Sequence, residues 1–334
     1  MKTFKSLQIQ KGLTLIELMI AVVLGIFLTG SITGLFVTSK QSYRIQESSS
    51  RLQENSRFAM FFITKDIRMA DYWGCLNTTE SIDNNLNSAA TFDLFTSAIG
   101  GENNNASVDS VIDGTDVITI KGAFGSGIYV TQQPATTSAS IKLEDDSDLG
   151  LHDIVLVTDC LDGDIFQITN DPSTPGSNGF DSIVHNTGNV GNPIPGNADK
   201  PLRKKYDTDA QVYKLNFATY SIQENPSGQP SLFRSINGAN ASELVEGIEN
   251  MQILYGEDTD NDKAPNYYLP ADSVILNMDD VVSIKVSLLM RSVEENLTSQ
   301  NIPYTIPGQA SVTPNDGALR RVFTSTIAIR NRLP

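Results

Sequence analysis

Residues 13–39 read LTLIELMIAVVLGIFLTGSITGLFVTS and contain a single ionisable side chain, Glu17. About 20 consecutive apolar residues are enough for a helix to cross a bilayer. Three lysines and no acid precede this segment, and a long acidic chain follows it. Because the cytoplasmic flanks of membrane helices are enriched in Lys and Arg, the sequence predicts one membrane-spanning helix with a cytoplasmic N-terminus.

Glu17 is the unusual residue of this segment, because an acid inside a membrane helix costs about 2.5–3.5 kcal/mol on insertion scales. Cleavage between Gly12 and Leu13 would create an α-amine four residues from Glu17, on the same helical face. That amine could neutralise the carboxylate of its own or of a neighbouring chain. The alternative is a simple anchor with a stray acid. A secretory signal peptide is excluded, because the apolar segment is long and no small-residue cleavage motif follows it.

The helical pattern continues beyond the apolar segment. Apolar residues recur at spacings of about one or two helical turns, which predicts one buried stripe. These residues are Ile45, Leu52, Ala59, Ile63 and Ile67. The sequence therefore predicts a single helix over residues 13–70, with its first half in the membrane and its second half against a globular body.

Past Cys75 the chain is rich in Asn, Ser, Thr, Gly and Asp, with β-branched runs between these polar stretches. Such runs predict strands separated by loops. The predicted strands cover residues 117–124, 153–160, 164–170, 211–223, 249–256, 281–292 and 321–331. Residues 171–205 are predicted as loop from their composition. The fold class is therefore α+β, with one long helix packed on a mainly antiparallel sheet.

The segment KGLTLIELMIAVVLG, residues 11–25, resembles the class III signal of type IV prepilins and of type II secretion pseudopilins. The resemblance implies that a prepilin peptidase cuts between Gly12 and Leu13 and N-methylates Leu13. It also implies that Glu17 guides assembly into a filament. Leu13 stands where these families usually have Phe, a substitution that keeps the apolar character.

Several segments of the body resemble the PilW family of minor pilins. They are SRLQENSRFAMFFITKDIRMADYWGC (50–75), DCLDGDIFQIT (159–169), GIENMQILYGEDTDND (247–262), VVSIKVSLLMRS (281–292) and RRVFTSTIAIRN (320–331). The resemblance implies a pilin-like fold with a cleaved leader at 1–12, a long helix at 13–70 and a β-rich head at 71–334. It implies a minor pilin of type IV pilus assembly, in a priming or tip complex. The alternatives are a minor pseudopilin of type II secretion and a pilus-tip adhesin.

The resemblance also implies partners and a location. The partners are other minor pilins, the major pilin, the prepilin peptidase and the inner membrane. We expect a single-pass inner-membrane protein before assembly and a pilus subunit at the cell surface afterwards. The formal net charge is −15, so an acidic body should repel nucleic acid, and no direct nucleic-acid binding is expected.

The sequence contains no recognisable arrangement of catalytic residues. It has two histidines, His152 and His185, and no Ser, His and Asp arrangement accompanies them. Phosphate-binding and dinucleotide-binding glycine motifs are missing as well. The sequence therefore predicts that the protein is not an enzyme and requires no cofactor.

Cys75 and Cys160 are the two cysteines of the chain. They form no C-x-x-C pair and have no Cys/His cluster around them, so a zinc site is not supported. If the body is exported, one disulfide between them is expected. Two unrelated buried thiols are the alternative.

Asp258, Asp260 and Asp262 alternate along one acidic stretch. Carboxylates at this spacing could gather around a hard cation such as calcium. The stretch departs from an EF-hand, because Lys263 stands where that loop needs Gly and Leu269 where it needs Glu. A solvated acidic turn between two strands is the other interpretation.

Overall fold

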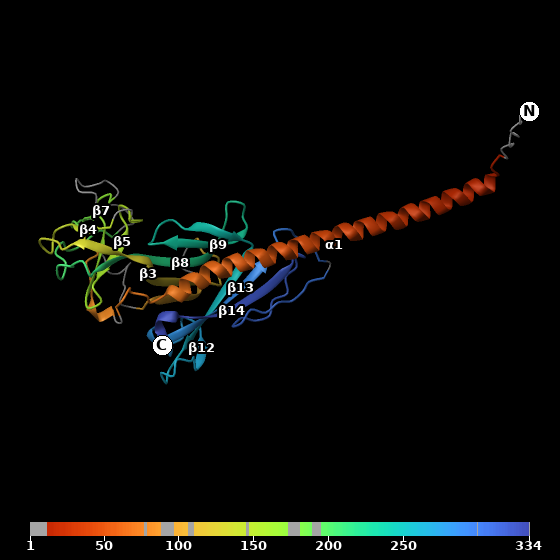
Figure 1. Cartoon of the computed structure of the whole chain (residues 1–334). Coiled ribbons are helices and arrows are strands. Elements are labelled where there is room, and N and C mark those ends of the chain that lie inside the picture. The colour runs from red at the N-terminus through yellow and green to blue at the C-terminus, as the bar shows by residue number, and fades with distance from the viewer. Residues whose placement is uncertain are drawn as a thin grey trace, which may run out of the picture.

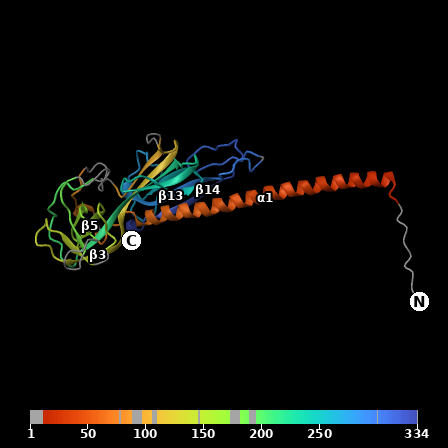
Figure 2. The same cartoon turned by 90° about the horizontal axis from the view of Figure 1, so that it is seen from above.

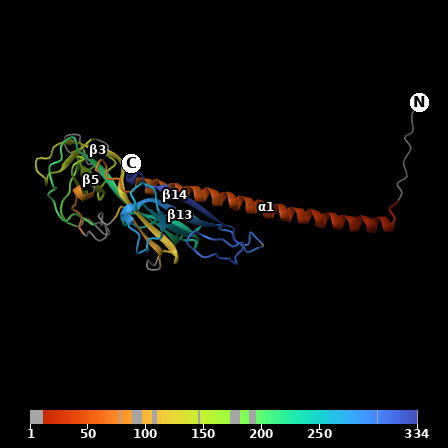
Figure 3. The same ribbon diagram turned by 90° about the horizontal axis from the view of Figure 1, so that it is seen from below.

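The computed structural model describes residues 12–76, 79–87, 97–105, 110–144, 147–172, 181–188, 195–298 and 300–333. Helix α1, Leu15–Met69, projects from a β-rich body (Figure 1). Its first half stands clear of the body and its second half lies along it, as the views from above and below also show (Figures 2 and 3). At 1.5 Å per residue the 55-residue helix is about 80 Å long.

The second half of α1 is held by its apolar stripe. Leu52, Ala59, Ile63 and Ile67 are buried against the body, as the spacing predicts. Ile45 is half-buried, because it lies where the helix begins to leave the body. The predicted helix is confirmed over all but its first two residues and its last.

The C-terminal end of α1 is fixed by residues from the other end of the chain. Asn331 donates its side-chain amide to the Ala70 carbonyl oxygen at 2.8 Å. The Arg332 guanidinium lies 2.7 Å from a carboxylate oxygen of Asp71. Gly122 of the sheet passes close beneath this point, and a Cβ there would come within 2.9 Å of the Met69 carbonyl oxygen. The C-terminal end of α1 is therefore held by the C-terminal residues Asn331 and Arg332 and packs closely on β3 at Gly122.

The body contains two sheets rather than the one that the sequence predicts. The larger sheet has the order β1-β6-β5-β8-β3-β4-β7, with β2 paired to β3, β9 paired to β8, and β10 paired to β9. Its strands are β1 (Ile82–Asn84), β2 (Ile99–Asn105), β3 (Thr115–Gln132), β4 (Ile141–Leu143), β5 (Ile154–Thr158), β6 (Gly163–Gln167), β7 (Asp181–Ile183), β8 (Gln211–Glu224), β9 (Pro230–Ile236) and β10 (Ser242–Glu246). The β1–β6 pair is parallel, and the other pairs described are antiparallel.

The smaller sheet is antiparallel and has the order β12-β11-β13-β14. Its strands are β11 (Ile248–Glu257), β12 (Tyr267–Leu269), β13 (Val281–Arg291) and β14 (Arg320–Ala328). All seven predicted strands are present across the two sheets. Strand β7, by contrast, lies inside the segment 171–205, which was predicted as loop. A strand of three residues is too short to be recognised from its composition.

The body divides into two lobes that share strands β3 and β8. The proximal lobe comprises the second half of α1, strand β2, strands β9–β14, the first half of β3 and the second half of β8, around one apolar core. The distal lobe comprises β1, β4–β7 and the remaining halves of β3 and β8, around two smaller cores. It lies beyond the C-terminal end of α1, at the end of the body farthest from the N-terminus (Figures 1 and 2).

Candidate functional site

The N-terminal turn of α1 brings three of the predicted site residues together. Gly12 and Leu13 precede the helix in exposed, non-helical backbone. Thr14 is the N-cap: its hydroxyl oxygen accepts the Glu17 backbone N–H at 3.3 Å. Glu17 reaches back, accepting the backbone N–H of Thr14 at 2.9 Å and its hydroxyl at 2.8 Å. This reciprocal capping box satisfies N–H groups that the first helical turn otherwise leaves unpaired.

This geometry bears on the predicted cleavage. Because the Glu17 carboxylate folds back onto Thr14, it lies one residue from the position where cleavage would leave a new α-amine. The peptide bond between Gly12 and Leu13 lies outside the helix and is exposed. Residues 1–11 of the predicted leader lie outside the described residues.

The first half of α1 is apolar on all sides and buries none of its surface in the body. Among the described residues α1 is the one helix long and apolar enough to cross a membrane. Its exposed large side chains include Leu15, Ile16, Leu18, Met19, Ile20, Val22, Val23, Leu24, Ile26, Phe27, Leu28, Ile32, Leu35, Phe36 and Val37. Such a surface is stable only in a lipid phase or against other proteins.

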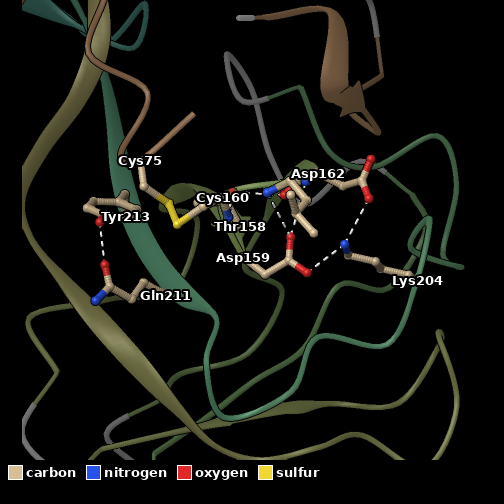
Figure 4. Close-up of a disulfide and its surroundings, with 9 residues drawn as sticks. Cys75, Thr158, Asp159, Cys160, Asp162, Lys204, Gln211 and Tyr213 are labelled. Carbon is tan, nitrogen blue, oxygen red and sulfur yellow. Dashed lines mark hydrogen bonds and ion pairs between the residues drawn. A yellow bond between two sulfur atoms is a disulfide. The ribbon is translucent and has the colours of Figure 1, made fainter. Parts of the chain in front are cut away.

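The two cysteines form the predicted disulfide. The Cys75 and Cys160 sulfurs are bonded at 2.09 Å, and 85 positions separate the residues in sequence (Figure 4). Cys75 follows the end of α1, and Cys160 lies in the turn between β5 and β6. The bond therefore ties the segment that leaves the helix to the distal lobe.

The turn that carries Cys160 is itself braced. The Cys160 N–H donates to the Thr158 hydroxyl oxygen at 3.1 Å, and the Lys204 ammonium contacts carboxylates of Asp159 at 2.6 Å and Asp162 at 2.8 Å (Figure 4). Partial burial would raise the pKa of Asp159, but Lys204 and two backbone N–H groups hold it below its ordinary value. Sequence reasoning missed Lys204, although the two acids flanking Cys160 were a signal that a cation would pair there.

The structure brings Asp258, Asp260 and Asp262 together in the loop between β11 and β12, with one carboxylate oxygen of each within 4.8 Å of the others. Asp258 is buried, and its carboxylate accepts backbone N–H groups of Asn261, Asp262 and Lys263. Burial would raise its pKa, but these donors hold the pKa below its ordinary value. The hydrogen bonds explain the position of Asp258 without a cation, so calcium binding stays a prediction.

Comparison with known proteins found one family whose model matches part of the proximal lobe. Residues 219–331 match the family model described as type IV pilus-assembly protein W, or PilW. This match supports a pilin of the PilW family. The matched segment covers about a third of the chain, from the second half of β8 through β14 to Asn331. Helix α1, strands β1–β7 and the first half of β8 lie outside it. Curated proteins and solved structures gave no match.

The PilW match supports a part in type IV pilus assembly and interaction with other pilus components. The family is one of assembly rather than of catalysis. The exposed apolar first half of α1 fits membrane anchoring. The predicted α+β pilin-like fold is present, with one long N-terminal helix and a mostly antiparallel body.

Proposed function

We propose that this protein is a minor pilin of the PilW family, processed between Gly12 and Leu13, that joins a priming or tip complex of the type IV pilus. The observation that carries the proposal is the division of α1 into two halves. The second half is fastened to the body, whereas the first half is apolar, exposed and interrupted by one carboxylate, Glu17. A helix of this kind can reside in the bilayer and later pack against equivalent helices without unfolding the body.

The role of Glu17 follows from the cost of an unpaired acid in an apolar phase. In the membrane its carboxylate is partly compensated by the capping hydrogen bonds with Thr14. A methylated amine on Leu13, in the same chain or a neighbouring one, would supply the missing positive charge. Pairing between chains would select subunits in axial register. Glu17 is therefore the residue that we expect to control entry into the filament.

The shape of the body supports an end position. The distal lobe lies beyond the C-terminal end of α1, nearly in line with the helix (Figures 2 and 3). If the helices pack parallel to the pilus axis, this lobe occupies the space that the next subunit towards the tip would need. A subunit of this shape fits best where nothing is stacked above it.

The first test is the mature N-terminus, measured by mass spectrometry on protein from membranes and from sheared pili. We expect N-methylated Leu13 in both fractions. An uncut Met1, or a cut beyond residue 30, would contradict processing at Gly12.

The second test is Glu17→Ala, which should leave the protein in the membrane but remove it from sheared pili. Glu224→Ala, an exposed acid of the body, is the matched control. Normal incorporation of the Glu17 variant would refute the assembly role.

A deletion separates the pilus from the secretion alternative, because both systems share the N-terminal chemistry. We expect loss of pili with normal export of secreted enzymes. The opposite pattern would assign the protein to a type II secretion system. A tip adhesin requires in addition that the pilus lose attachment when only the distal lobe is altered.

A further inference from the structure

The second half of α1 carries an exposed face opposite its buried stripe. The exposed positions Glu54, Arg57, Phe58, Phe61, Lys65 and Arg68 recur at helical spacing and so lie on one face. Phe58 is 53% exposed and Phe61 is 62% exposed, whereas Leu52, Ile63 and Ile67 of the same helix are buried. Tyr43, 67% exposed, lies about five helical turns before Phe61, on the same face.

Three cations of this face have no ion-pair partner among the described residues. Arg51 pairs with Glu47, and the buried Asp66 pairs with Arg234. Arg57, Lys65 and Arg68, by contrast, form no ion pair with any residue that the structure describes, in a chain of net charge −15. We name Arg57, Phe58, Phe61, Lys65 and Arg68 the basic stripe. Its two phenylalanines are flanked by three free positive charges.

A surface of opposite character lies on the same body. The segment between β12 and β13 exposes Val274 at 99% and Ile275 at 65%. Asp272, Asp279 and Asp280 are exposed around these two side chains, and no ion pair of theirs occurs in the described part of the chain. We name residues 272–280 the acidic loop. It presents two aliphatic side chains among three aspartates that form no ion pair with the described residues.

Hydrogen bonds fix the conformation of the acidic loop. Asn277 caps its short 3₁₀ turn by accepting the Asp279 N–H at 3.2 Å, and it donates to the Asp280 carboxylate at 2.7 Å. The Arg332 guanidinium donates to the carbonyl oxygens of Met278 at 2.6 Å and Val281 at 2.9 Å. A preformed loop loses little conformational entropy on binding, which favours its use as a contact.

The two surfaces form no ion pair with each other within the described part of the chain. The basic stripe faces away from the body, since the opposite side of α1 is buried on it. The acidic loop follows β12, an edge strand of the smaller sheet, and Arg332 joins it to Asp71 just beyond the C-terminal end of α1. Complementary patches on different sides of one molecule favour a heterologous contact between two copies.

We propose that the acidic loop of one copy of this chain docks on the basic stripe of a neighbouring copy. Val274 and Ile275 would cover Phe58 and Phe61, and the aspartates would face Arg57, Lys65 and Arg68. The contact rests on the proposed function, because membrane anchoring of α1 places neighbouring copies side by side in a parallel orientation. Anionic lipid is a poorer occupant, because Arg57 lies about 27 Å along the helix beyond residue 39, outside the headgroup region.

Cysteine cross-linking in membranes tests the contact. Two full-length chains with different tags are co-expressed, one carrying Phe61→Cys and the other Val274→Cys. The native cysteines are already joined to each other within the chain. Mild oxidation should give a disulfide-linked dimer that carries both tags. Thr208→Cys, an exposed position of the distal lobe, replaces Val274→Cys in the control pair and should give no dimer.

Charge reversal tests the chemistry. Adding Lys65→Glu to the Phe61→Cys chain should lower the dimer yield about tenfold, because like charges then face one another. Adding Asp279→Lys to the Val274→Cys chain should restore it. Lys205→Glu, the same change at an exposed lysine of the distal lobe, should have no effect. Absence of the mixed dimer, an equal yield with the Thr208→Cys control, or capture of a different pilin by Phe61→Cys would overturn the proposal.

The mature N-terminus is read in the same samples. A processed chain that forms no dimer would refute this contact alone. An unprocessed chain that forms the dimer would refute the proposed prepilin role and leave the contact standing.

Discussion

Asp116 is a carboxylate buried between the two sheets. Its two oxygens accept the backbone N–H groups of Asn104 at 2.8 Å and of Ile253 at 2.6 Å, so it joins β3 to β11. Burial raises its pKa to about 6, Asp272 adds to the rise, and the two N–H donors oppose it only in part. The carboxylate thus supports the packing of the sheets but is costly to ionise.

This pKa makes the stability of the body depend on pH. The folded pKa lies above the unfolded value of about 3.9, so the folded state binds an extra proton between these values. The stabilisation is complete below about pH 4 and is lost as the pH rises through about 6, by up to about 3 kcal/mol. We expect Asp116→Asn to flatten the change in unfolding midpoint between pH 5 and pH 7.5. Asp113→Asn, at an exposed position, should keep the wild-type slope, and an unchanged slope in Asp116→Asn would contradict the prediction.

At the scale of elements, α1 is docked by a buried polar contact as well as by its apolar stripe. Asp66 is 3% exposed and accepts the Tyr220 hydroxyl at 2.6 Å, and the Arg234 guanidinium lies 2.9 Å from the same carboxylate. Burial and the neighbouring Asp66 carboxylate raise the pKa of Tyr220, so its hydroxyl remains a donor. The Asp66 carboxylate of α1 thereby contacts both β8 and β9.

Removing this carboxylate should loosen the helix from the body. Asp66→Ala leaves Tyr220 without its acceptor and Arg234 without its anion, and loss of one partner of a buried pair costs about 3–5 kcal/mol. We expect the lower end, because the Arg234 side chain is 25% exposed. The urea midpoint of the full chain in detergent measures the loss. Glu54→Ala, an exposed position on the same helix, should change it by less than about 0.5 kcal/mol.

The disulfide acts at the same scale, between the end of α1 and the β5–β6 turn. Closing a loop of 85 residues should stabilise the folded chain by about 4–5 kcal/mol in the chain-entropy model. Replacing both cysteines by serine should remove that amount, and reduction of the wild-type protein should lower the unfolding free energy equally. A loss below about 1 kcal/mol would mean that the Lys204 contacts alone hold the turn.

At the scale of the whole molecule, β3 and β8 run through both lobes, so the lobes should unfold together. Phe166 is fully buried in the distal lobe, and Phe166→Ala should cost about 3–5 kcal/mol. We expect hydrogen exchange to rise equally in β5 of the distal lobe and in β13 of the proximal lobe. Trp73, the single tryptophan, is buried in a distal-lobe core next to the helix end and reports the same transition by fluorescence. Exchange that rises in the distal lobe alone would show that the lobes are independent.

The sequence by itself determined the features that are encoded locally. The apolar run with Glu17, the helical spacing of Leu52, Ala59 and Ile63, and the β-branched runs each carry their own periodicity, so each element was predictable from its own residues. The two cysteines could be paired because the chain has no others. The acidic stretch at 258–262 could also be recognised in the sequence. The hydrogen bonds from the loop backbone to the Asp258 carboxylate could not.

Only the tertiary structure decided what depends on residues far apart in the chain. The division into two sheets, the burial of Asp116 between them, the meeting of Asp66 with Arg234, and the separation of the basic stripe from the acidic loop all involve partners more than a hundred positions apart. A local pattern specifies which face of an element is apolar. It does not specify which other element covers that face, because that choice is made by the packing of the whole chain.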